Sequence, residues 1–272
     1  MNTLRSPESE LADAVCLTVD VDWVCPEVLA DLVGLLDGRG LSATFFCTHP
    51  GIEVPGHERA IHPNFRHRGD TMRRLRREVT EDLDSLGESA IYEYVVRATM
   101  AFCPEARGVR GHSLFYDSLL LPFYHAAGIE YDSTYLLPLV PDLTPFYKEY
   151  DILEIPIYFN DHFYIKLEGT DFSTAALGLD RPGLKVCQFH PNMVYLNAAS
   201  DHHYQETRSF YHDAEALRKC RNPGPGIRSL FLSLIDALAA SRRPTLTLGR
   251  VNDMRRASGR GRFEWLGKDR RP

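Results

Sequence analysis

AVCLTVDVDW, residues 14–23, opens the pattern that decides the fold of this chain. Every second residue from Val15 to Val21 is a large aliphatic one, and this period of two is typical of a strand with one apolar and one polar face. The segment EVLADLVGLLDGRG, residues 27–40, places its apolar residues on one side of a helix. SATFFCT, residues 42–48, follows as a second strand. A strand, a helix and a strand with short joints form a βαβ unit, which implies a parallel sheet.

The alternation of strand-like and helical segments continues along the chain. Further strands are predicted at residues 60–65, 108–113, 129–135, 152–159, 184–189 and 244–251, and helices at residues 71–101 with a break near Gly87, 116–128 and 229–241. At least seven strands interleaved with helices favour one distorted (β/α) barrel of the α/β class over two domains. We expect this barrel domain over residues 14–253, after a loose segment at residues 1–13 and before a basic, solvated tail at residues 254–272.

The composition bounds the class of protein. Of the 272 residues, 44% are hydrophobic and 25% charged, as in ordinary globular proteins. The formal net charge of -6 disfavours sequence-independent binding of nucleic acid, because that binding rests on neutralising phosphates. The six cysteines include no CxxC pair and indicate a reducing compartment. The first fifteen residues lack the apolar core of a signal peptide, and no stretch is long and apolar enough for a transmembrane segment, so we expect a cytoplasmic protein.

Ionisable side chains stand at four predicted strand ends. They are Asp20 with Asp22, His62, Arg110 with His112, and His190. Residues i and i+2 of a strand point the same way, so Asp20 and Asp22 are expected side by side. Barrel enzymes carry their chemistry at the carboxyl ends of their strands. Each of these side chains alone is equally typical of a turn or a surface, and only their convergence on one barrel face predicts a site.

The same residues carry a resemblance to the polysaccharide deacetylase family, also called carbohydrate esterase family 4. TVDVDW resembles a DxD variant of the family's first motif, and ATFF follows at residues 43–46. GHE at residues 56–58 leads to AIHP at residues 60–63, an arginine strand is matched by Arg110, and a late His-Pro by His190 with Pro191. The similar region spans about residues 14–200. DxD, HPN, RxH and FHP together resemble a variant subgroup.

The resemblance implies roles for these positions. Asp20 is expected to be the base that takes a proton from the attacking water, and Asp22 and His62 are expected to be metal ligands. His190 is expected to protonate the leaving amine, because an amine does not leave as an anion. Arg110 is expected to orient Asp20 through a bidentate contact.

The third metal ligand departs from the family pattern. Family members carry a second histidine four residues after the first, but that position holds Arg66 here and His67 is one step late. We predict His112 as the third ligand, because it should share one side of a strand with Arg110. His67 stays open as the alternative, since a loop can bend to bring it in.

The resemblance implies a metal-dependent hydrolase that removes an N-acetyl group from a cytosolic, carrier-linked or natural-product sugar. One divalent metal ion is expected, zinc before iron, cobalt, manganese or nickel, which accept the same ligands. Candidate substrate contacts are Trp23, Asn64, Asp161 and Tyr195, while the arginines between residues 66 and 77 are interpreted as a solvated helix face. Hydrolysis of a small linear or cyclic amide is the alternative within enzymes, and a catalytically inactive sugar-binding protein is the alternative from another class. The sequence indicates no particular oligomeric state.

Overall fold

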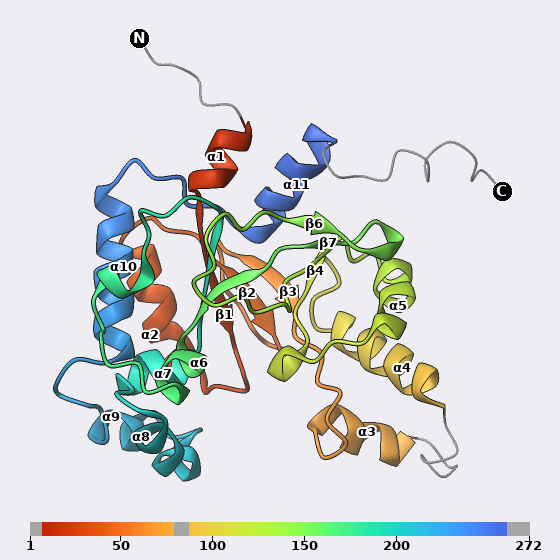
Figure 1. Cartoon of the computed structure of the whole chain (residues 1–272). Coiled ribbons are helices and arrows are strands. Elements are labelled where there is room, and N and C mark those ends of the chain that lie inside the picture. The colour runs from red at the N-terminus through yellow and green to blue at the C-terminus, as the bar shows by residue number, and fades with distance from the viewer. Residues whose placement is uncertain (1–6, 79–86, 260–272) are drawn as a thin grey trace.

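The computed structural model describes residues 7–78 and 87–259, and a nine-stranded sheet lies at the centre (Figure 1). The strand order is β6-β7-β5-β4-β3-β2-β1-β9-β8, and all neighbouring strands are parallel except β6 and β7. The strands are β1 (Val15–Asp20), β2 (Thr44–Cys47), β3 (Glu58–Ile61), β4 (Gly108–Val109), β5 (Tyr131–Asp132), β6 (Phe146–Tyr147), β7 (Leu153–Glu154), β8 (Ile157–Asn160) and β9 (Lys185–Phe189).

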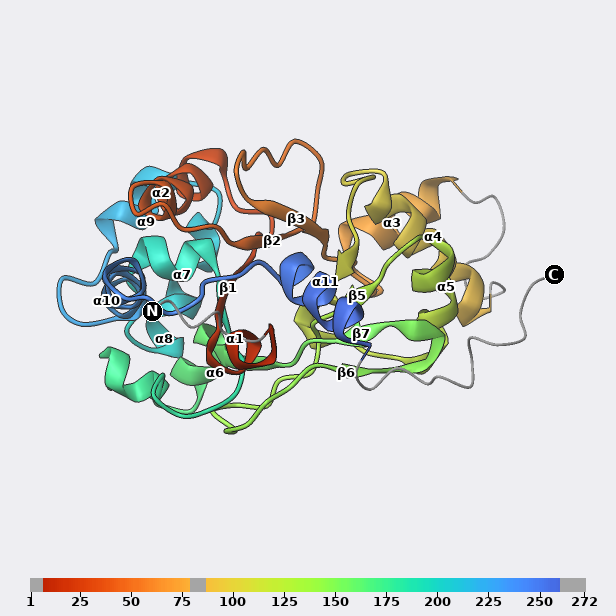
Figure 2. The same cartoon turned by 90° about the horizontal axis from the view of Figure 1, so that it is seen from above.

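The helices form two groups at opposite ends of the molecule (Figure 2). One group contains α2, α7 and α10, and the other contains α3, α4 and α5. The helices are α1 (Pro7–Asp13), α2 (Pro26–Asp37), α3 (Asp70–Glu78), α4 (Glu88–Met100), α5 (Leu121–Ala126), α6 (Asp161–Lys166), α7 (Pro191–Leu196), α8 (Asp201–Glu206), α9 (Ala214–Lys219), α10 (Ile227–Ala240) and α11 (Leu248–Ser258). No helix in the described ranges combines the length and the apolar character needed to cross a membrane.

β1 is buried along its whole length, because both of its faces are covered. Val15 and Leu17 pack into the large hydrophobic cluster beneath the outer helices. Cys16, on the opposite face, packs with Phe46 and Tyr131 in a second cluster. The face expected to be polar therefore points into the curled sheet, and its polar residues lie inside the protein.

The sheet curls until its two ends approach each other. An isolated parallel bridge joins Leu136, just after β5, to Ile157 in β8 at the other end of the strand order. The predicted α/β class and distorted barrel are confirmed. The sheet has nine strands where about seven were predicted, because β6 was missed and the segment 152–159 is divided into β7 and β8. Pro156 lies at this division, where it has no N–H to donate to a ladder.

The two ends of the described chain correct the sequence interpretation. Residues 7–13 were expected to be loose but form α1, because Leu11 packs against the inner cluster. The strand predicted at residues 244–251 is only one bridge from Thr245 to Val15. Thr247 then accepts a hydrogen bond from the Arg250 N–H and starts α11, which continues to Ser258 into the expected tail. Residues 1–6 and 260–272 of the two predicted terminal segments lie outside the described residues.

Candidate active site

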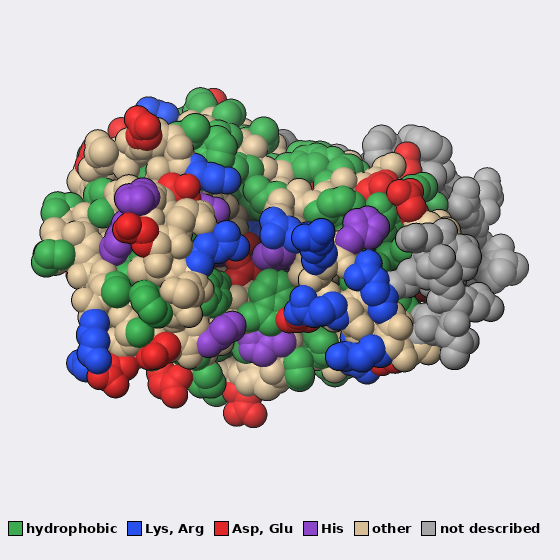
Figure 3. All heavy atoms as spheres, turned by 90° about the horizontal axis from the view of Figure 1, so that it is seen from below, with side chains coloured by type: hydrophobic (Ala, Val, Ile, Leu, Met, Phe, Trp, Pro, Cys, Tyr) green, Lys and Arg blue, Asp and Glu red, His purple; other side chains and the backbone are tan. Residues whose placement is uncertain are grey.

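A cleft of about 850 Å³ opens at the carboxyl ends of the central strands. Asp20, His62 and His190 reach it from the ends of β1, β3 and β9. α1 and α11 lie at the opposite end of the sheet (Figure 1). Figure 3 shows acidic and histidine side chains inside a hollow on this face, with lysine and arginine side chains around it. The cleft therefore lies where parallel α/β folds place their ligands.

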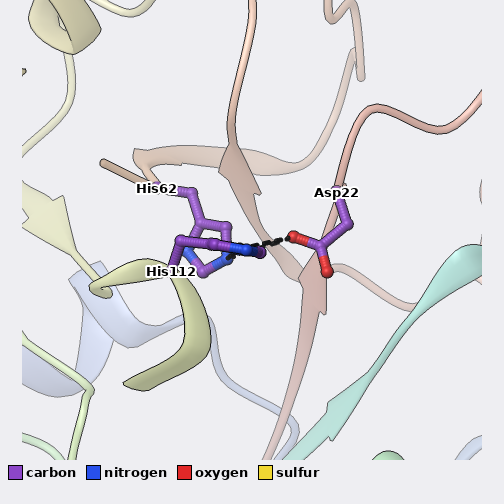
Figure 4. Close-up of side chains that lie close together, drawn as sticks. All are labelled: Asp22, His62 and His112. Atoms are coloured by element: carbon purple, nitrogen blue, oxygen red, sulfur yellow. Dashed lines mark hydrogen bonds and ion pairs between the residues drawn. The ribbon is translucent and has the colours of Figure 1, made fainter. Parts of the chain in front are cut away.

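Asp22, His62 and His112 converge in this cleft (Figure 4). Asp22 Oδ1 lies 3.1 Å from His112 Nδ1 and 3.4 Å from His62 Nε2, and the two ring nitrogens are 3.4 Å apart. Two ligands about 2.0–2.2 Å from one zinc ion at a tetrahedral angle are roughly 3.3–3.6 Å apart. The three donor atoms therefore have the spacing and the chemical character of one metal site.

The His62 ring is held in the tautomer that a metal ligand needs. Its Nδ1 lies 2.7 Å from the backbone oxygen of Arg110. A carbonyl oxygen only accepts, so Nδ1 carries the proton and donates it. In the neutral ring Nε2 then carries the lone pair on the side of Asp22 and His112, which is the usual arrangement for a metal-binding histidine.

Mutual electrostatic effects favour the charged forms of His62 and Asp22. Burial lowers the pKa of His62, but Asp20 and Asp22 outweigh burial and raise it above its ordinary value. Burial raises the pKa of the Asp22 carboxyl, but hydrogen bonds from His112 and His62 hold it well below its usual range. A metal ion binding here would meet a carboxylate whose charged form is favoured, and it would compete with a proton for Nε2 of His62.

Asp22 reaches the cleft from a turn and not from a strand. β1 ends at Asp20, and Asp22 and Trp23 have φ angles of 46° and 57° in the left-handed region. The Trp23 N–H donates to Thr48 Oγ1 at 3.2 Å, which ties this turn to the end of β2. Left-handed backbone at a residue other than glycine costs about 1–3 kcal/mol and is concentrated at functional sites. The side-by-side position of the two aspartates therefore comes from a strained turn and not from the i, i+2 strand geometry.

Asp20 is buried and held by two donors. Its Oδ1 accepts from Arg110 Nη1 at 2.7 Å, and its Oδ2 accepts from Gln188 Nε2 at 2.5 Å. The contact with Arg110 therefore uses one carboxylate oxygen and is not the bidentate pair expected from the sequence. Sequence reasoning missed Gln188, although it stands two residues before His190 and pairs in register with Thr18 on β1.

Arg110 is fully buried inside the curled sheet. Its Nε donates to the Ser133 backbone oxygen at 2.7 Å and its Nη2 to the Ser133 hydroxyl at 2.9 Å. The guanidinium also stacks on the Phe46 ring at 4.1 Å. β4 ends at Val109, so Arg110 and His112 do not share a strand, and His112 begins a 3-10 helix, η2 (His112–Leu114).

A second buried ionic cluster supports Arg110 from behind. Lys148 Nζ donates to Asp132 at 2.5 Å and to Glu154 at 2.7 Å. Asp132 precedes Ser133, the partner of Arg110, and it accepts from the hydroxyl of Thr134. The Thr134 hydroxyl oxygen in turn accepts a hydrogen bond from the backbone N–H of Gly111, the residue before His112. The cluster therefore fixes residues 132–134, which hydrogen-bond both to Arg110 and to the turn before His112.

We expect Lys148→Met to lower the free energy of unfolding by about 3–5 kcal/mol, because two buried carboxylates lose their cation. Lys219→Met is the matched control, since Lys219 is exposed and the ion pair identified for it joins it to Glu215, one helical turn away. Its loss should be about 0.5 kcal/mol or less. Urea unfolding of both variants measures the difference. Equal losses in the two variants would show that the buried cluster does not hold this side of the sheet.

His190 is held by the buried carboxylate of Asp161. His190 Nδ1 donates to Asp161 Oδ1 at 2.6 Å, and the His190 backbone N–H donates to Oδ2 at 2.7 Å. Burial lowers the pKa of His190, but the charge of Asp161 and this hydrogen bond outweigh it and raise the pKa to about 10. His190 Nε2 lies 3.7 Å from Asp22 Oδ2, so a protonated nitrogen faces the metal-ligand cluster.

The structure separates the other sequence candidates. Trp23 lines the cleft and packs edge-to-face against His112, with ring centroids 5.1 Å apart. Asp161 is fully buried on His190 and does not line the cleft as a substrate contact would. Neither Asn64 nor Tyr195 is among the described residues that line the cleft. Asn64 accepts a hydrogen bond from the Arg66 backbone N–H, and the Tyr195 ring stacks on the guanidinium of Arg221.

His67 lies apart from the ligand cluster. Its side chain is exposed, and the group of possible ligands contains His112 in its place.

Further residues line the cleft that sequence reasoning did not assign to the site. They include Lys166, Tyr204, Arg208 and Tyr211. They come from the segments on either side of β9, in which short helices follow one another. The signal for them in the sequence is the number of histidine and tyrosine residues in this part of the chain.

A curled α/β sheet with aspartates and histidines gathered at the carboxyl ends of its strands is the architecture of the polysaccharide deacetylases. Residues 17–208 match the family model of the WbmS-like polysaccharide deacetylases, and the chain belongs to that family of sugar deacetylases. A search of curated protein sequences returned no significant match.

Two solved structures extend this comparison. A protein from Bordetella bronchiseptica, assigned as a polysaccharide deacetylase involved in O-antigen biosynthesis, is 26% identical with a TM-score of 0.69. The alignment covers 85% of this chain and 93% of that one. A protein from Mycobacterium smegmatis assigned as a polysaccharide deacetylase shares the fold at 16% identity, with a TM-score of 0.54 and 94% of each chain covered.

Proposed function

We propose that the protein hydrolyses the N-acetyl group of a sugar-containing substrate, using a divalent metal ion held by Asp22, His62 and His112. One observation carries the proposal. Three ligand atoms lie within 4.8 Å of one another, between a buried carboxylate and a histidine that keeps its proton. A nucleophilic water, its base and an acid for the leaving group can therefore meet at one acetamide.

The metal ion, when bound, supplies Lewis acidity, which lowers the pKa of water and polarises the amide carbonyl. Zinc is the expected ion, although an Asp–His–His set also accepts iron, cobalt, manganese or nickel.

Asp20 takes the proton of the attacking water in this proposal. Its Oδ2 lies 3.5 Å from His62 Nε2, so it borders the ligand cluster without belonging to it. Arg110 and Gln188 position the carboxylate. His190 then donates its Nε2 proton to the departing amine, and Asp161 keeps that proton available through Nδ1.

The proposed substrate is a small or carrier-linked acetamido sugar and not an assembled extracellular polymer. The sequence motivates this through the expected cytoplasmic location. The Bordetella relative, assigned to O-antigen biosynthesis, supports a precursor of a surface polysaccharide.

The alternatives explain less of the site. A sugar-binding protein without activity would have no use for a base and an acid that flank the same cluster. Hydrolysis of a small linear or cyclic amide would use the same residues, and inactivity on every acetamido sugar combined with cleavage of such an amide would favour it.

Incubation with soluble and lipid-linked acetamido sugars should release one acetyl group per sugar, detected by mass spectrometry. The protein is supplied with zinc, and in parallel with cobalt or manganese. A sample treated with chelator is the control and should be inactive. Good activity on chitin or intact cell wall, with none on any soluble acetamido sugar, would contradict the proposed substrate.

We expect His112→Ala to reduce metal content to near background and His67→Ala to leave it unchanged. The reason is that His112 Nδ1 is one of the three clustered ligand atoms, whereas His67 is exposed. Metal analysis of the purified proteins measures this directly. Loss of metal in the His67 variant with retention in the His112 variant would exchange their roles.

A further inference from the structure

Three basic side chains line the cleft, and no ion pair is identified for any of them within the described residues. They are Arg66, Lys166 and Arg208. Arg66 donates to the hydroxyl of Ser113 at 2.6 Å, and Arg208 to the side-chain oxygen of Gln205 at 3.2 Å, so both partners are neutral. Within residues 7–78 and 87–259, no carboxylate oxygen lies within 4.0 Å of a charged nitrogen of any of these three side chains. The charge of Lys166 acts at longer range on Asp201.

Two neighbouring arginines, in contrast, form ion pairs with acidic residues. Arg73 pairs with Asp70, and Arg74 pairs with Glu78 at 2.7 Å on the exposed side of α3. The predicted solvated helix face therefore describes these two residues. Arg66 is different, because it stands before the helix and faces the cleft. Of the acidic residues that line the cleft, Asp20 and Asp22 belong to the site described above, and Asp70 is paired with Arg73.

Each of the three cations is attached to an element that also serves the site. Arg66 contacts Ser113, the residue after His112. Lys166 ends α6, the helix that begins at Asp161. Arg208 follows α8, whose Tyr204 lines the cleft. All three line the cleft that contains the candidate metal ligands, so a group held by these cations would share that cleft with the acetamide.

We propose that this basic rim, Arg66, Lys166 and Arg208, binds a phosphate or diphosphate group carried by the acetamido sugar. The inference rests on the proposed function and narrows its substrate class. Three cations from separate elements supply more positive charge than one carboxylate requires. Guanidinium groups match phosphate oxygens in a two-pronged geometry. A volume of about 850 Å³ is near the upper end for ligand pockets and exceeds what one sugar ring needs.

The test compares three forms of one sugar. They are the unsubstituted acetamido sugar, its 1-phosphate and its nucleoside diphosphate derivative, and an acetamido uronic acid serves as the carboxylate arm. We expect the wild type to favour the phosphorylated forms in kcat/KM by about tenfold or more, the effect of one or two charge-assisted contacts. The preference should shrink as salt is raised, because exposed charges are screened.

Single substitutions assign the preference to the rim. Each of three substitutions, Arg66→Gln, Lys166→Gln and Arg208→Gln, should raise KM for the phosphorylated sugar about tenfold. The increase in KM for the neutral sugar should be several-fold smaller. Arg74→Gln removes the same charge outside the cleft and should change neither. Arg208→Lys keeps the positive charge but not the two-pronged geometry, so it should recover part of the loss.

A binding measurement separates this inference from the proposed function. Calorimetry with the Asp20→Asn protein should show tighter binding of the phosphorylated sugar than of the neutral one. Equal binding and equal kcat/KM for the two would overturn the phosphate site while leaving the deacetylase intact. A stronger preference for the uronic acid would also overturn it. Tight binding of the sugar phosphate without any release of acetate by the wild type would instead overturn the deacetylase.

Discussion

Asp20→Asn should abolish turnover while the protein keeps its metal. An asparagine retains the shape of the side chain and can still accept from Arg110, but it cannot take a proton from water. Loss of a general base costs about 10²–10⁴ in rate, and we expect a loss of kcat near the upper end. Asp22→Asn should have a different result, because it removes the only carboxylate of the ligand cluster. That variant should lose its metal together with its activity.

Measurement of kcat alongside metal content distinguishes the two aspartates. Asp236→Asn is a matched control, since Asp236 is exposed and contacts only the Arg39 side chain among the interactions identified for it. It should retain both metal and activity. An empty site in Asp20→Asn combined with a full site in Asp22→Asn would reverse the assignment of base and ligand.

His190→Ala should slow amide hydrolysis by about 10²–10⁴-fold and affect an activated acetate ester far less. An amine must be protonated as it leaves, whereas a phenolate-type group departs as a stable anion. Side-by-side assays of an acetamido sugar and an aryl acetate measure the ratio. Similar losses on both substrates would remove His190 from the acid role.

Asp161→Asn tests how the proton on His190 is kept. In the structure Asp161 is the main reason that the pKa of His190 is raised to about 10. Removing the charge lowers this pKa, and the acid must be protonated to work. The decline of kcat at high pH should therefore begin at a lower pH in the variant than in the wild type. An unchanged alkaline limb would show that another group provides the proton.

The sequence alone determined the fold class and the family of this protein. The period of two in Val15–Val21, followed by a helical stretch and a second strand, is a local property that needs no knowledge of the rest of the chain. The family motifs are equally local, because they are short runs at strand ends. Since parallel strands share one carboxyl edge, the sequence also predicted that the side chains at these strand ends would meet, with His112 placed ahead of His67 as the third ligand.

Only the tertiary structure decided what holds these residues. Gln188 contacts Asp20 because β9 pairs with β1 across about 170 positions of sequence, and Asp161 meets His190 because β8 lies beside β9. The single hydrogen bond from Arg110 to Asp20 and the ionic cluster around Lys148 also join residues that are far apart in the sequence or that only the packing of the sheet brings together. Asp22 reaches the cleft through a left-handed turn that no period reveals. Side-chain periodicity reports which face a residue occupies, but partners depend on strand order and register, which the packing of the whole chain sets.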